Sequence, residues 1–526
     1  MIYVLTPSEM RAADEAAGEA IGRPTLMRNA GSAIARRLHA IAPQGGRVVA
    51  FAGPGDNGGD AFAAVAALRS GYERVVYAAA APRPSAARSE SESAAKEAGV
   101  LVRPLPQTDD EAQRAVQGAA VAIDALFGTG ARLPVAQPFE AAALALDARL
   151  LHVLAVDVPS GIDASSGVVG NVAVRATETV TLAALKPGLL LMPAREHVGV
   201  LSCASIGIDD ATLEAHARTY CALDDDAFVA LLPVRELESD KRRAGAPLVV
   251  AGSRQFPGAA ILCALGAARA GAGYVTLATP SAAADGARAH LVEQVVVELA
   301  DGAAPSEIVE TVLDIAKHNS AIAIGPGLAL DDRTGEIVRG IIERATLPIV
   351  ADASALFHLG KHLEPLRGKQ IVLTPHAGEF ARLSGKGTVR EEERVERLRE
   401  FVDRTGIATL LKGLTTLVYG GDAMFLNTTG TNALATAGTG DVLTGVIATL
   451  LSQGLSPFQA ARTGAYWHGL AGREAAQARP RGVIARDVIE SLAASLTRCR
   501  DRLSCVPHDP AEDRCIVAVD LNGFVR

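Results

Sequence analysis

The sequence feature that most constrains the fold is a short apolar strand that leads directly into a glycine-rich turn and then into a helix. The strand covers residues 47–52, the turn Gly-Pro-Gly-Asp-Asn-Gly-Gly-Asp covers 53–60, and a helix is predicted at 61–68. This succession is the repeating unit of doubly wound parallel sheets, and its turn can hold a phosphate. The glycines lack the G-x-G-x-x-G spacing of a dinucleotide-binding fingerprint. The chain is therefore predicted to begin with an α/β domain built on a doubly wound parallel sheet.

Two further strands, which begin at residues 121 and 151, also end in turns that carry carboxylates. Ligands of parallel sheets collect beyond the carboxyl ends of the strands, so these turns are predicted to form one shared site. The side chains expected at this site are Asn57, Asp60, Asp124, Asp157 and Ser160. Oxygen ligands without histidine or cysteine do not suit a typical zinc site, and they fit an alkali or alkaline-earth cation.

Four motifs of the first half are together similar to those of the NAD(P)H-hydrate epimerase domain, and the resemblance covers residues 1–220. The motifs are the turn at 53–60, Asp-Ala-Leu-Phe-Gly-Thr-Gly at 124–130, Asp-Val-Pro-Ser-Gly-Ile-Asp at 157–163 and Lys-Pro-Gly at 186–188. The resemblance implies a Rossmann-like fold and a potassium ion held by Asn57, Asp124 and Ser160. It implies contacts with a hydrated nicotinamide nucleotide from Asp56, Asn57, Gly58, Gly59, Asp60, Gly128, Thr129, Gly130, Ala131, Arg132, Leu133, Pro134 and Asp157. By the same resemblance, Asp157 is the candidate for the group that handles a proton.

Two positions depart from the family pattern, because Asp56 and Ala61 stand where the family usually has asparagine and glycine. Asp56 adds a negative charge beside the expected substrate phosphate. Lys186 lies in a turn between two strands; it could contact a phosphate, but a solvated loop lysine is the simpler interpretation. Residues 78–98 are rich in alanine and serine, and they predict a loop followed by an exposed helix without a function.

In the second half, a stretch of small residues from Thr431 to Gly445 is predicted to begin as a loop and to become a helix at Gly440 and Asp441. The backbone N–H groups of a first helical turn have no partner within the helix. Glycine lets a phosphate approach these groups closely, and the helix dipole favours the negative charge. Asp441 would then lie beside the bound anion, where a carboxylate can reach a neighbouring hydroxyl. Taken alone, Gly-Thr-Gly-Asp also fits an aspartate that caps a helix.

A second series of strands, separated by helical patterns, predicts a second α/β unit that is not a repeat of the first. The strands are at 247–252, 274–278, 321–325, 348–352 and 371–375. The turns suited to a ligand site are at 252–260, 325–327, 374–379 and 412–416. Taken singly, His376 is more simply a structural histidine and Lys412 a surface lysine. Together with Gly440 and Asp441, they match a kinase-like nucleotide site.

These motifs resemble the ribokinase-like fold and, within it, the NAD(P)H-hydrate dehydratases that use ADP or ATP, over residues 225–498. They are Gly-Pro-Gly at 325–327, Thr-Pro-His-x-Gly-Glu at 374–379, Lys-Gly at 412–413, Gly-Thr-Gly-Asp-Val-Leu-Thr-Gly at 438–445 and His-Gly-x-Ala-Gly at 468–472. The resemblance assigns the adenine nucleotide, with Mg²⁺ bridging its phosphates, to Lys412, Gly413, Leu414, Thr415, Thr416 and Gly440. It assigns the hydrate to Ala260, Gly327, His376 and Asp441. Similarity to the bacterial two-domain form favours ADP as the donor.

The two resemblances imply an enzyme that repairs hydrated NAD(P)H. The first domain would interconvert the R and S epimers of the hydrate. The second would phosphorylate the ring hydroxyl of the S form, with Asp441 as proton acceptor, so that the ring nitrogen can expel phosphate. The helix N-terminus weakens Asp441 as a base, whereas the neighbouring phosphate charge acts in the opposite direction.

Two rival functions are compatible with parts of the sequence. One is a ribokinase-like kinase of a small hydroxylated vitamin precursor, fused to a non-catalytic binding domain. It would release a stable phosphoester, whereas a dehydratase releases free phosphate. The other is a scaffold for RNA-processing partners. Retention of Asn57, Asp124, Asp157 and Ser160 and the net negative charge argue against the scaffold.

Composition narrows the remaining classes of protein. The chain has 51 Lys and Arg against 59 Asp and Glu, a net charge of −8, which argues against non-specific binding of nucleic acid. Six scattered cysteines without a C-x-x-C pair indicate reduced thiols in a cytoplasmic protein, and no signal peptide is expected. The most apolar window, 259–278, predicts a buried helix and strand and not a membrane span.

Three segments lie outside or between the two domains. Residues 209–226 and 232–243 are charged or polar, and they predict the join between the domains. Residues 499–526 predict a short appended tail. Alanine-rich helices suit packed assemblies, so a homo-oligomer without membrane or nucleic-acid partners is expected.

Overall fold

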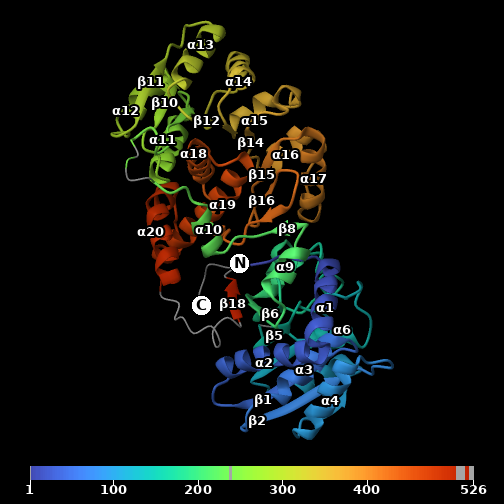
Figure 1. Ribbon diagram of the computed structural model, residues 1–526. Helices are drawn as coiled ribbons and strands as arrows, with labels where there is room; N and C mark the ends of the chain where they lie inside the picture. The colour runs from blue at the N-terminus through green and yellow to red at the C-terminus, as the bar shows by residue number, and fades with distance from the viewer. Residues whose placement is uncertain (1, 148, 236–237, 239, 505–515, 520–526) are drawn as a thin grey trace. The chain divides into compact units, whose positions relative to one another are not determined.

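The computed structural model describes residues 2–147, 149–235, 238, 240–504 and 516–519. The described chain divides into two compact units, with the boundary between Ala222 and Leu223. The N-terminal unit covers residues 2–222 together with 516–519, and the C-terminal unit covers 223–504. Each unit is an α/β fold with a sheet of its own (Figure 1), so the predicted fold class is confirmed.

The sheet of the N-terminal unit has the strand order β18-β7-β6-β5-β4-β1-β2-β3. Strands β1 to β7 pair in parallel, and β18 pairs antiparallel with β7 at one edge. The strands are β1 (Gly46–Ala52), β2 (Tyr72–Ala78), β3 (Leu101–Pro104), β4 (Val121–Ala125), β5 (Val153–Val156), β6 (Glu178–Leu182), β7 (Val200–Ala204) and β18 (Ile516–Val519). The two-residue strand β8 (Tyr220–Cys221) belongs to this unit but not to this sheet. The order reverses between β1 and β4, which is where doubly wound folds bind their ligands.

The helices of this unit are α1 (Pro7–Ile21), α2 (Arg23–Ile41), α3 (Asp56–Ala66), α4 (Ala86–Glu97), α5 (Asp109–Val116), α6 (Phe139–Ala145), α7 (Pro187–Leu190), α8 (Arg195–Val198) and α9 (Asp210–His216). They cover both faces of the sheet, because the strands are apolar on both faces. Along β1, Val48 and Ala50 pack in one core with α2, α3 and α4, whereas Val49 and Phe51 pack in a second core with α5 and α6. This alternation follows the two-residue period of a strand.

Two local predictions for this unit are wrong. Helix α3 begins at Asp56 and not at Ala61, so most of the predicted turn is the first part of the helix. A glycine stands at position 58 inside this helix because the helix packs closely against Gly53 there. A Cβ on Gly58 would lie 2.3 Å from the Gly53 carbonyl oxygen. The predicted turn at 186–188 instead begins the short helix α7, with Lys186 at its N-cap position.

The C-terminal unit contributes strands in the order β11-β10-β9-β12-β13-β14-β15-β16-β17, of which the neighbours from β11 to β15 are parallel. Strand β16 pairs antiparallel with β15 on one side and with β17 on the other. The strands are β9 (Pro247–Val250), β10 (Thr276–Pro280), β11 (Val295–Leu299), β12 (Ala321–Ile324), β13 (Ile349–Ala351), β14 (Ile371–Leu373), β15 (Ala408–Leu411), β16 (Leu417–Tyr419) and β17 (Met424–Leu426). The five predicted strands correspond to β9, β10, β12, β13 and β14.

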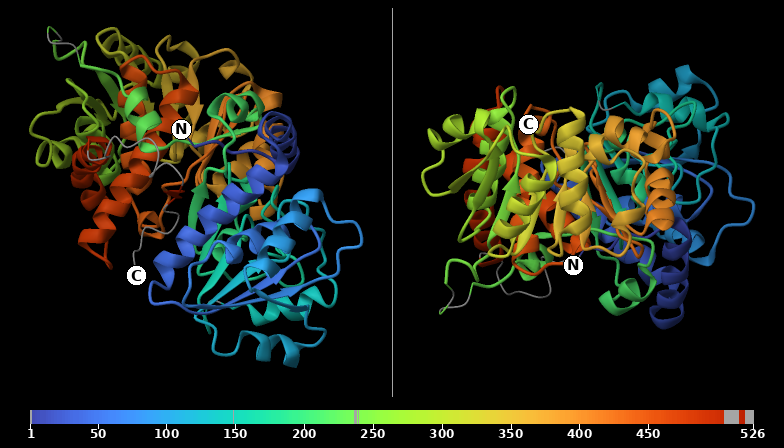
Figure 2. Two further views of the ribbon diagram at one scale, coloured as in Figure 1. Left: turned by 60° about the horizontal axis from the view of Figure 1, so that its bottom comes forward. Right: turned by 90° about the horizontal axis from the view of Figure 1, so that it is seen from above.

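Helices pack on both faces of this sheet, as Figure 2 shows from two further directions. Helix α11 contacts β9 and β10, and α18 contacts β9, β12 and β13. Helix α19 contacts β14, β15 and β16, and α17 contacts β15 and β16. The helices are α10 (Asp225–Leu231), α11 (Pro257–Arg269), α12 (Ser281–Arg288), α13 (Pro305–Ala316), α14 (Asp332–Arg344), α15 (Ser354–Leu359), α16 (Ala377–Ser384), α17 (Arg394–Thr405), α18 (Thr439–Ser452), α19 (Pro457–Ala478) and α20 (Ala485–Ser504), with 3₁₀ turns η1 (Glu364–Leu366), η2 (Glu391–Glu393) and η3 (Asn432–Leu434).

The apolar window 259–278 is part of this core. It contains most of α11 and the first residues of β10, as predicted. Among the described residues, none of the helices has the length and the apolar character that crossing a membrane requires.

The predicted join and tail contain regular structure. The join includes α9 and α10, while residues 236–237 and 239 lie outside the described residues. The predicted tail begins inside α20 and includes β18. Its residues 505–515 and 520–526 also lie outside the described residues.

Helices α11 and α18 approach each other closely because Gly445 has no side chain. A Cβ on Gly445 would lie 2.1 Å from the carbonyl oxygen of Cys263 and 2.7 Å from the backbone nitrogen of Ala267. Backbone atoms cannot move aside as a flexible side chain can, so a larger residue must separate the two helices.

We therefore expect Gly445→Ala to lower the unfolding free energy of the C-terminal unit by about 1–3 kcal/mol, a typical cost of overpacking. Thermal unfolding can be followed by the fluorescence of Trp467, the single tryptophan of the chain, which is buried in this unit. Gly286→Ala in α12 is the matched control, because its Cβ would meet nothing closer than 3.9 Å. Equal melting temperatures for the two variants would contradict the close approach.

Candidate active sites

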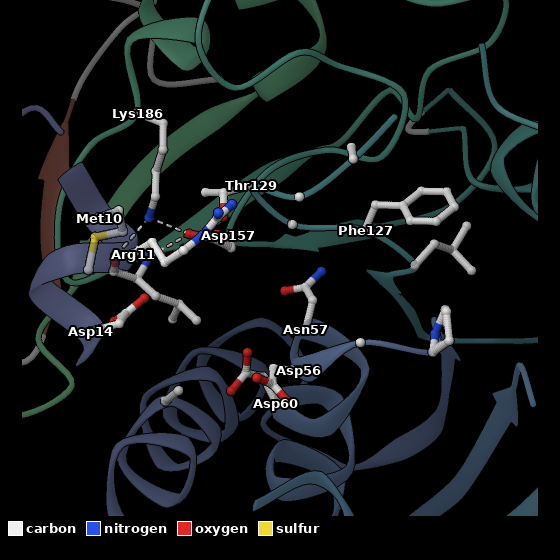
Figure 3. A pocket seen from close by; sticks show the side chains of 18 of the residues that line it. Met10, Arg11, Asp14, Asp56, Asn57, Asp60, Phe127, Thr129, Asp157 and Lys186 are labelled. Carbon is white, nitrogen blue, oxygen red and sulfur yellow. Dashed lines mark hydrogen bonds and ion pairs between the residues drawn. The ribbon is translucent and has the colours of Figure 1, made fainter. Parts of the chain in front are cut away.

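A cavity of about 770 Å³ lies in the N-terminal unit. It is lined by the turns that follow β1, β4 and β5, which are neighbouring parallel strands, and by residues of α1 and α2 (Figure 3). The predicted substrate residues that line it are Asp56, Asn57, Asp60, Gly128, Thr129, Gly130, Ala131, Arg132, Pro134 and Asp157. Gly58 and Gly59 instead lie where α3 packs against other parts of the protein, because a Cβ on either would meet neighbouring protein atoms. The Leu133 side chain lies near Gly170. The structure thus brings together most of the residues predicted for this site.

Asp157 is held firmly at the end of β5 by a buried ion pair. Its Oδ1 lies 2.5 Å from the Lys186 Nζ, and it accepts hydrogen bonds from the Thr181 hydroxyl and the Leu182 N–H, both at 3.1 Å. Lys186 is 1% exposed and also donates to the Leu182 carbonyl at 2.7 Å. The interpretation of Lys186 as a solvated loop residue is therefore wrong. The other carboxylate oxygen, Oδ2, lies toward Gly128, where a Cβ would be 3.3 Å away.

The oxygen-bearing side chains predicted to bind a cation lie at the same edge. Ser160 donates to the fully buried Asp124 from its hydroxyl at 2.6 Å and from its N–H at 2.7 Å. Burial raises the pKa of Asp124 to about 6, although the hydrogen bonds from Ser160 oppose this change. The side-chain amide of Asn57 is buried, and within the described residues neither its oxygen nor its nitrogen has a hydrogen-bond partner. An amide oxygen without a donor, a carboxylate and a hydroxyl fit a hard cation such as potassium.

Two more carboxylates face this cavity from helices. Asp14 lies on α1, and burial raises its pKa to about 6, an effect that Lys186 opposes and Asp157 reinforces. Asp60 lies on α3. Burial raises the pKa of Asp60 well above its usual range, and the negative charges of Asp157 and Asp56 add to the effect. Sequence reasoning did not select Asp14, because the face that α1 turns toward the cavity depends on how the helix packs.

The loop and the largely exposed helix predicted for residues 78–98 are present, the helix being α4, and residues of this segment contact the N-terminal turn of α3. Arg88 is 1% exposed and donates to the Gly55 carbonyl at 3.1 Å, while its guanidinium lies over the ring of Phe62. Ser85 donates to Asp56 Oδ1 at 2.5 Å. The negative charge of Asp56 lies at the first turn of α3, where the helix dipole favours it.

In the C-terminal unit, the four turns predicted to carry ligand contacts follow four parallel strands of one sheet. They follow β9, β12, β14 and β15, and β13 lies between β12 and β14 in the sheet. Gly252, after β9, donates its N–H to the Pro326 carbonyl at 2.8 Å. Lys412, after β15, donates its N–H to the Pro375 carbonyl at 2.9 Å, which places it beside the loop of His376.

Asp441 lies in the first turn of α18, next to a partly buried ion pair. Gly438, the N-cap, has a positive φ of 88°, and Asp441 follows two residues after the helix begins at Thr439. Lys412 Nζ lies 2.6 Å from Oδ1 of Asp352, and a Cβ on Gly440 would be 3.3 Å from this ammonium nitrogen. The structure thus brings Asp441, Gly440 and Lys412 together, as predicted.

The pKa of Asp441 is raised to about 7. Burial is the largest cause, and the negative charge of Asp352 adds to it, while the positive charge of Lys412 acts in the opposite direction. The effect of burial exceeds the expected influence of the helix N-terminus, so Asp441 can act as a base near neutral pH.

The predicted hydrate contacts lie at the same edge of the sheet. Gly327 has a positive φ of 67°, and a Cβ there would lie 2.6 Å from the carbonyl oxygen of Phe256. Ala260 is buried on α11 beside Gly252. Phe256 is 51% exposed next to these small residues, an aromatic surface that sequence reasoning did not single out.

His376 combines a structural role with exposure. Its Nδ1 accepts hydrogen bonds from the N–H groups of Gly378 at 3.0 Å and Glu379 at 3.4 Å, so it caps α16. The side chain is nevertheless 57% exposed, and its Nε2 lies 3.6 Å from Glu379 Oε1. Both interpretations of this residue are therefore compatible with its position.

Arg394 of α17 binds the backbone of loop 412–416, which is the loop predicted to bind the nucleotide. The buried Arg394 guanidinium donates to the carbonyls of Leu411, Lys412 and Thr415 at 3.0–3.3 Å. Gly413 makes room for it, since a Cβ there would lie 2.3 Å from Nη2. Gly413 and Leu414 are exposed, Thr416 donates to the Gly413 carbonyl at 3.0 Å, and Thr415 is buried.

Comparisons with known proteins match both units. The family model described as NAD(P)H-hydrate dehydratase matches residues 247–494, and the model of the YjeF-related protein N-terminus matches residues 23–188. A bifunctional NAD(P)H-hydrate repair enzyme of Pyrobaculum aerophilum is 35% identical over 503 residues, which are 94% of this chain and 98% of that protein. One from Moorella thermoacetica is 34% identical over 532 residues, 96% of this chain and 98% of that protein.

The chain belongs to the family of bifunctional NAD(P)H-hydrate repair enzymes. The predicted resemblance of both halves is thereby confirmed. Among solved structures, an ADP/ATP-dependent NAD(P)H-hydrate dehydratase from Bacillus subtilis, co-crystallised with ATP and Mg²⁺, is 30% identical with a TM-score of 0.47. The match covers 54% of this chain and 99% of that chain.

In this member of the repair-enzyme family, the pair of Asp157 and Lys186 can be tested through stability. Lys186→Met leaves the Asp157 charge without its buried partner, and breaking such a pair typically costs about 3–5 kcal/mol. We expect a lower melting temperature of the N-terminal unit by circular dichroism, with the Trp467 fluorescence transition of the C-terminal unit unchanged. The double variant Lys186→Met/Asp157→Asn removes both charges and should recover much of the loss. A double variant as unstable as the single one would contradict the ion pair.

The raised pKa of Asp441 predicts that this carboxylate destabilises the folded enzyme. The folded pKa of about 7 exceeds the usual value of 3.8, so the penalty is absent below the lower value and complete above the higher one. Asp441→Asn should therefore stabilise the C-terminal unit by up to roughly 4 kcal/mol at pH 8, and by less than half of that at pH 5. Thermal unfolding followed by Trp467 fluorescence measures both. A gain that is the same at the two pH values would contradict the shift.

Proposed function

We propose that this chain restores NAD(P)H from its hydrates by two activities, one in each unit. The N-terminal unit epimerises the R and S forms of the hydrate. The C-terminal unit dehydrates the S form with ADP or ATP, releasing AMP or ADP together with phosphate. The observation that carries the proposal is Asp441, a carboxylate with a pKa near neutral, in the first turn of a helix beside the Lys412 ammonium.

In the C-terminal unit, we propose that the exposed loop 412–416 and the first turn of α18 hold the adenine nucleotide. The N–H groups at Gly440 and the Lys412 ammonium provide positive charge for its terminal phosphate. Asp441 removes the proton of the ring hydroxyl, and the hydroxyl oxygen attacks the terminal phosphorus. Its proton acceptor role is favoured by burial, which raises its pKa. Bound Mg²⁺ would neutralise charge on the transferring phosphoryl group.

The phosphorylated hydroxyl is a better leaving group than hydroxide. The lone pair of the ring nitrogen forms a C–N double bond as the C–O bond to phosphate breaks, and loss of a ring proton restores the dihydropyridine. Gly327, Ala260 and His376 are proposed to hold the nicotinamide half of the substrate. Gly327 lets its turn lie directly against the backbone of Phe256, whose ring is exposed, and the His376 side chain is exposed at the same edge of the sheet.

In the N-terminal unit, we propose that the cavity beside Asp157 binds the hydrate and that Asp157 is the group that handles a proton during epimerisation. Its free oxygen lies toward Gly128, and Lys186 keeps the carboxylate oriented. A potassium ion held by Asn57, Asp124 and Ser160 would supply positive charge for the substrate phosphates. The buried amide oxygen of Asn57, which accepts no hydrogen bond from the part of the chain that the structure describes, supports this assignment.

The test is recovery of NADH absorbance from the isolated S hydrate with ADP or ATP, Mg²⁺ and K⁺. Free phosphate should appear in step with NADH. A stable phosphoester without NADH would instead show the kinase of a hydroxylated precursor. The isolated R hydrate should also be consumed, which a dehydratase specific for the S form cannot do without the epimerase.

We expect Asp441→Asn to lower kcat of dehydration by roughly 10²–10⁴, the usual contribution of a general base. Because the base must be ionised, kcat/KM of the unchanged enzyme should rise with pH and reach half its maximum near pH 7. Epimerisation of the hydrate by the same variant is the internal control for a folded chain. Normal dehydration by the variant would exclude Asp441 as the base.

A further inference from the structure

Asp352 links Lys412 to α18 in the C-terminal site, and it belongs to none of the sequence motifs of that site. It follows β13 directly and is 1% exposed. Its Oδ1 receives the Lys412 ammonium at 2.6 Å, and its Oδ2 accepts a hydrogen bond from the Thr444 hydroxyl at 2.7 Å. Thr444 lies one turn after Asp441 on α18. One buried carboxylate thus ties the end of β15 to the first turns of α18.

The position of Lys412 needs such a carboxylate. The ammonium lies against Gly440, at the end of α18 where the backbone N–H groups carry partial positive charge. A cation is disfavoured at a helix N-terminus, and a partly buried one more so. Asp352 offsets this repulsion and keeps the ammonium in place before an anion arrives.

The negative charge of Asp352 also acts on Asp441 and raises its pKa. The ionisable groups around Asp441 come from four elements: Asp352 after β13, Lys412 after β15, Cys263 on α11 and His468 on α19. Burial raises the pKa of the Cys263 thiol and lowers the pKa of His468 to about 4, so both are neutral near pH 7. The charges that act on Asp441 among the described groups are therefore those of Asp352 and Lys412.

We propose that Asp352 is a positioning residue for phosphoryl transfer, which fixes Lys412 at the first turn of α18 and keeps negative charge beside Asp441. It touches neither reactant in this arrangement and acts through its two neighbours. The inference rests on the proposed dehydratase function of the same site.

The variant Asp352→Asn keeps the size of the side chain and removes its charge. Two effects follow from the geometry. Lys412 loses its counter-ion, so the KM for ADP or ATP should rise about tenfold or more. Asp441 loses a negative neighbour and becomes a weaker base, so the half-point of the kcat/KM profile should move to lower pH by about one unit, with a plateau at least tenfold lower.

A variant that removes the positive charge of the pair, and not the negative one, separates this role from general damage to the fold. Lys412→Met leaves the Asp352 charge unbalanced beside Asp441, so the half-point should move to higher pH. Asp314→Asn is the matched control: it also removes the carboxylate of a Lys ion pair, but from the exposed end of α13, which leads into the amino end of β12. Its kinetics and profile should equal those of the unchanged enzyme.

The outcomes distinguish the inference from the proposed function. If the unchanged enzyme yields no NADH from the hydrate, the proposed function fails. If it does, and Asp352→Asn loses activity equally at every pH, or the two variants move the half-point in the same direction, Asp352 has no positioning role. Asp352→Glu serves where Asp352→Asn does not fold; it should retain the profile of the unchanged enzyme with a lower plateau, and a moved half-point would overturn the proposal.

Discussion

Each of the two sites contains an ion pair between an aspartate and a lysine, which is buried in the N-terminal unit and partly buried in the C-terminal unit. Asp157 follows β5 and pairs with Lys186, and Asp352 follows β13 and pairs with Lys412. Removing two charges from water costs several kcal/mol per ion, and apolar residues of the same size often give equal or greater stability. These pairs are therefore better explained by the sites they organise than by the stability of the fold. Each fixes one carboxylate and one ammonium where a charged ligand would otherwise have to order them.

The parallel sheets explain why both sites form where they do. Neighbouring parallel strands end at one edge, so residues distant in sequence arrive side by side without any long-range signal. The N-terminal unit uses this edge to gather carboxylates and amides around a cavity. The C-terminal unit uses it to place a loop and the first turn of α18 beside Asp352 and Lys412. The same architecture thus places a different set of polar and charged side chains at the edge of each sheet.

Much of this arrangement could be predicted because it depends on local patterns. Asp124, Asp157 and Asp441 were found from strands that end in polar turns and from glycines that open a helix. Asp352 gave the same signal at the end of a predicted strand, and it could have been found by the same rule.

The remaining residues depend on tertiary packing. Asp14 and Arg88 lie on helices, and no sequence pattern states which helical face meets the cavity or the turn it supports. Lys186 is buried because an aspartate distant in sequence pairs with it. The strands β11 and β15 to β17 were not predicted, although the equally short β13 and β14 were. A proposed role in binding nevertheless rests on geometry and resemblance together, since neither identifies a ligand by itself.

The balance of charges at Asp441 decides whether a helix N-terminus can carry a base at all. A helix dipole favours a nearby anion by about 0.3–1 kcal/mol, which lowers the pKa of a carboxylate by less than one unit. Burial together with the charge of Asp352 raises it from 3.8 to about 7, which corresponds to roughly 4 kcal/mol. Burial therefore exceeds the dipole several-fold. The first turn of α18 can attract a phosphate through its N–H groups while its own carboxylate, near half ionised at neutral pH, still accepts a proton.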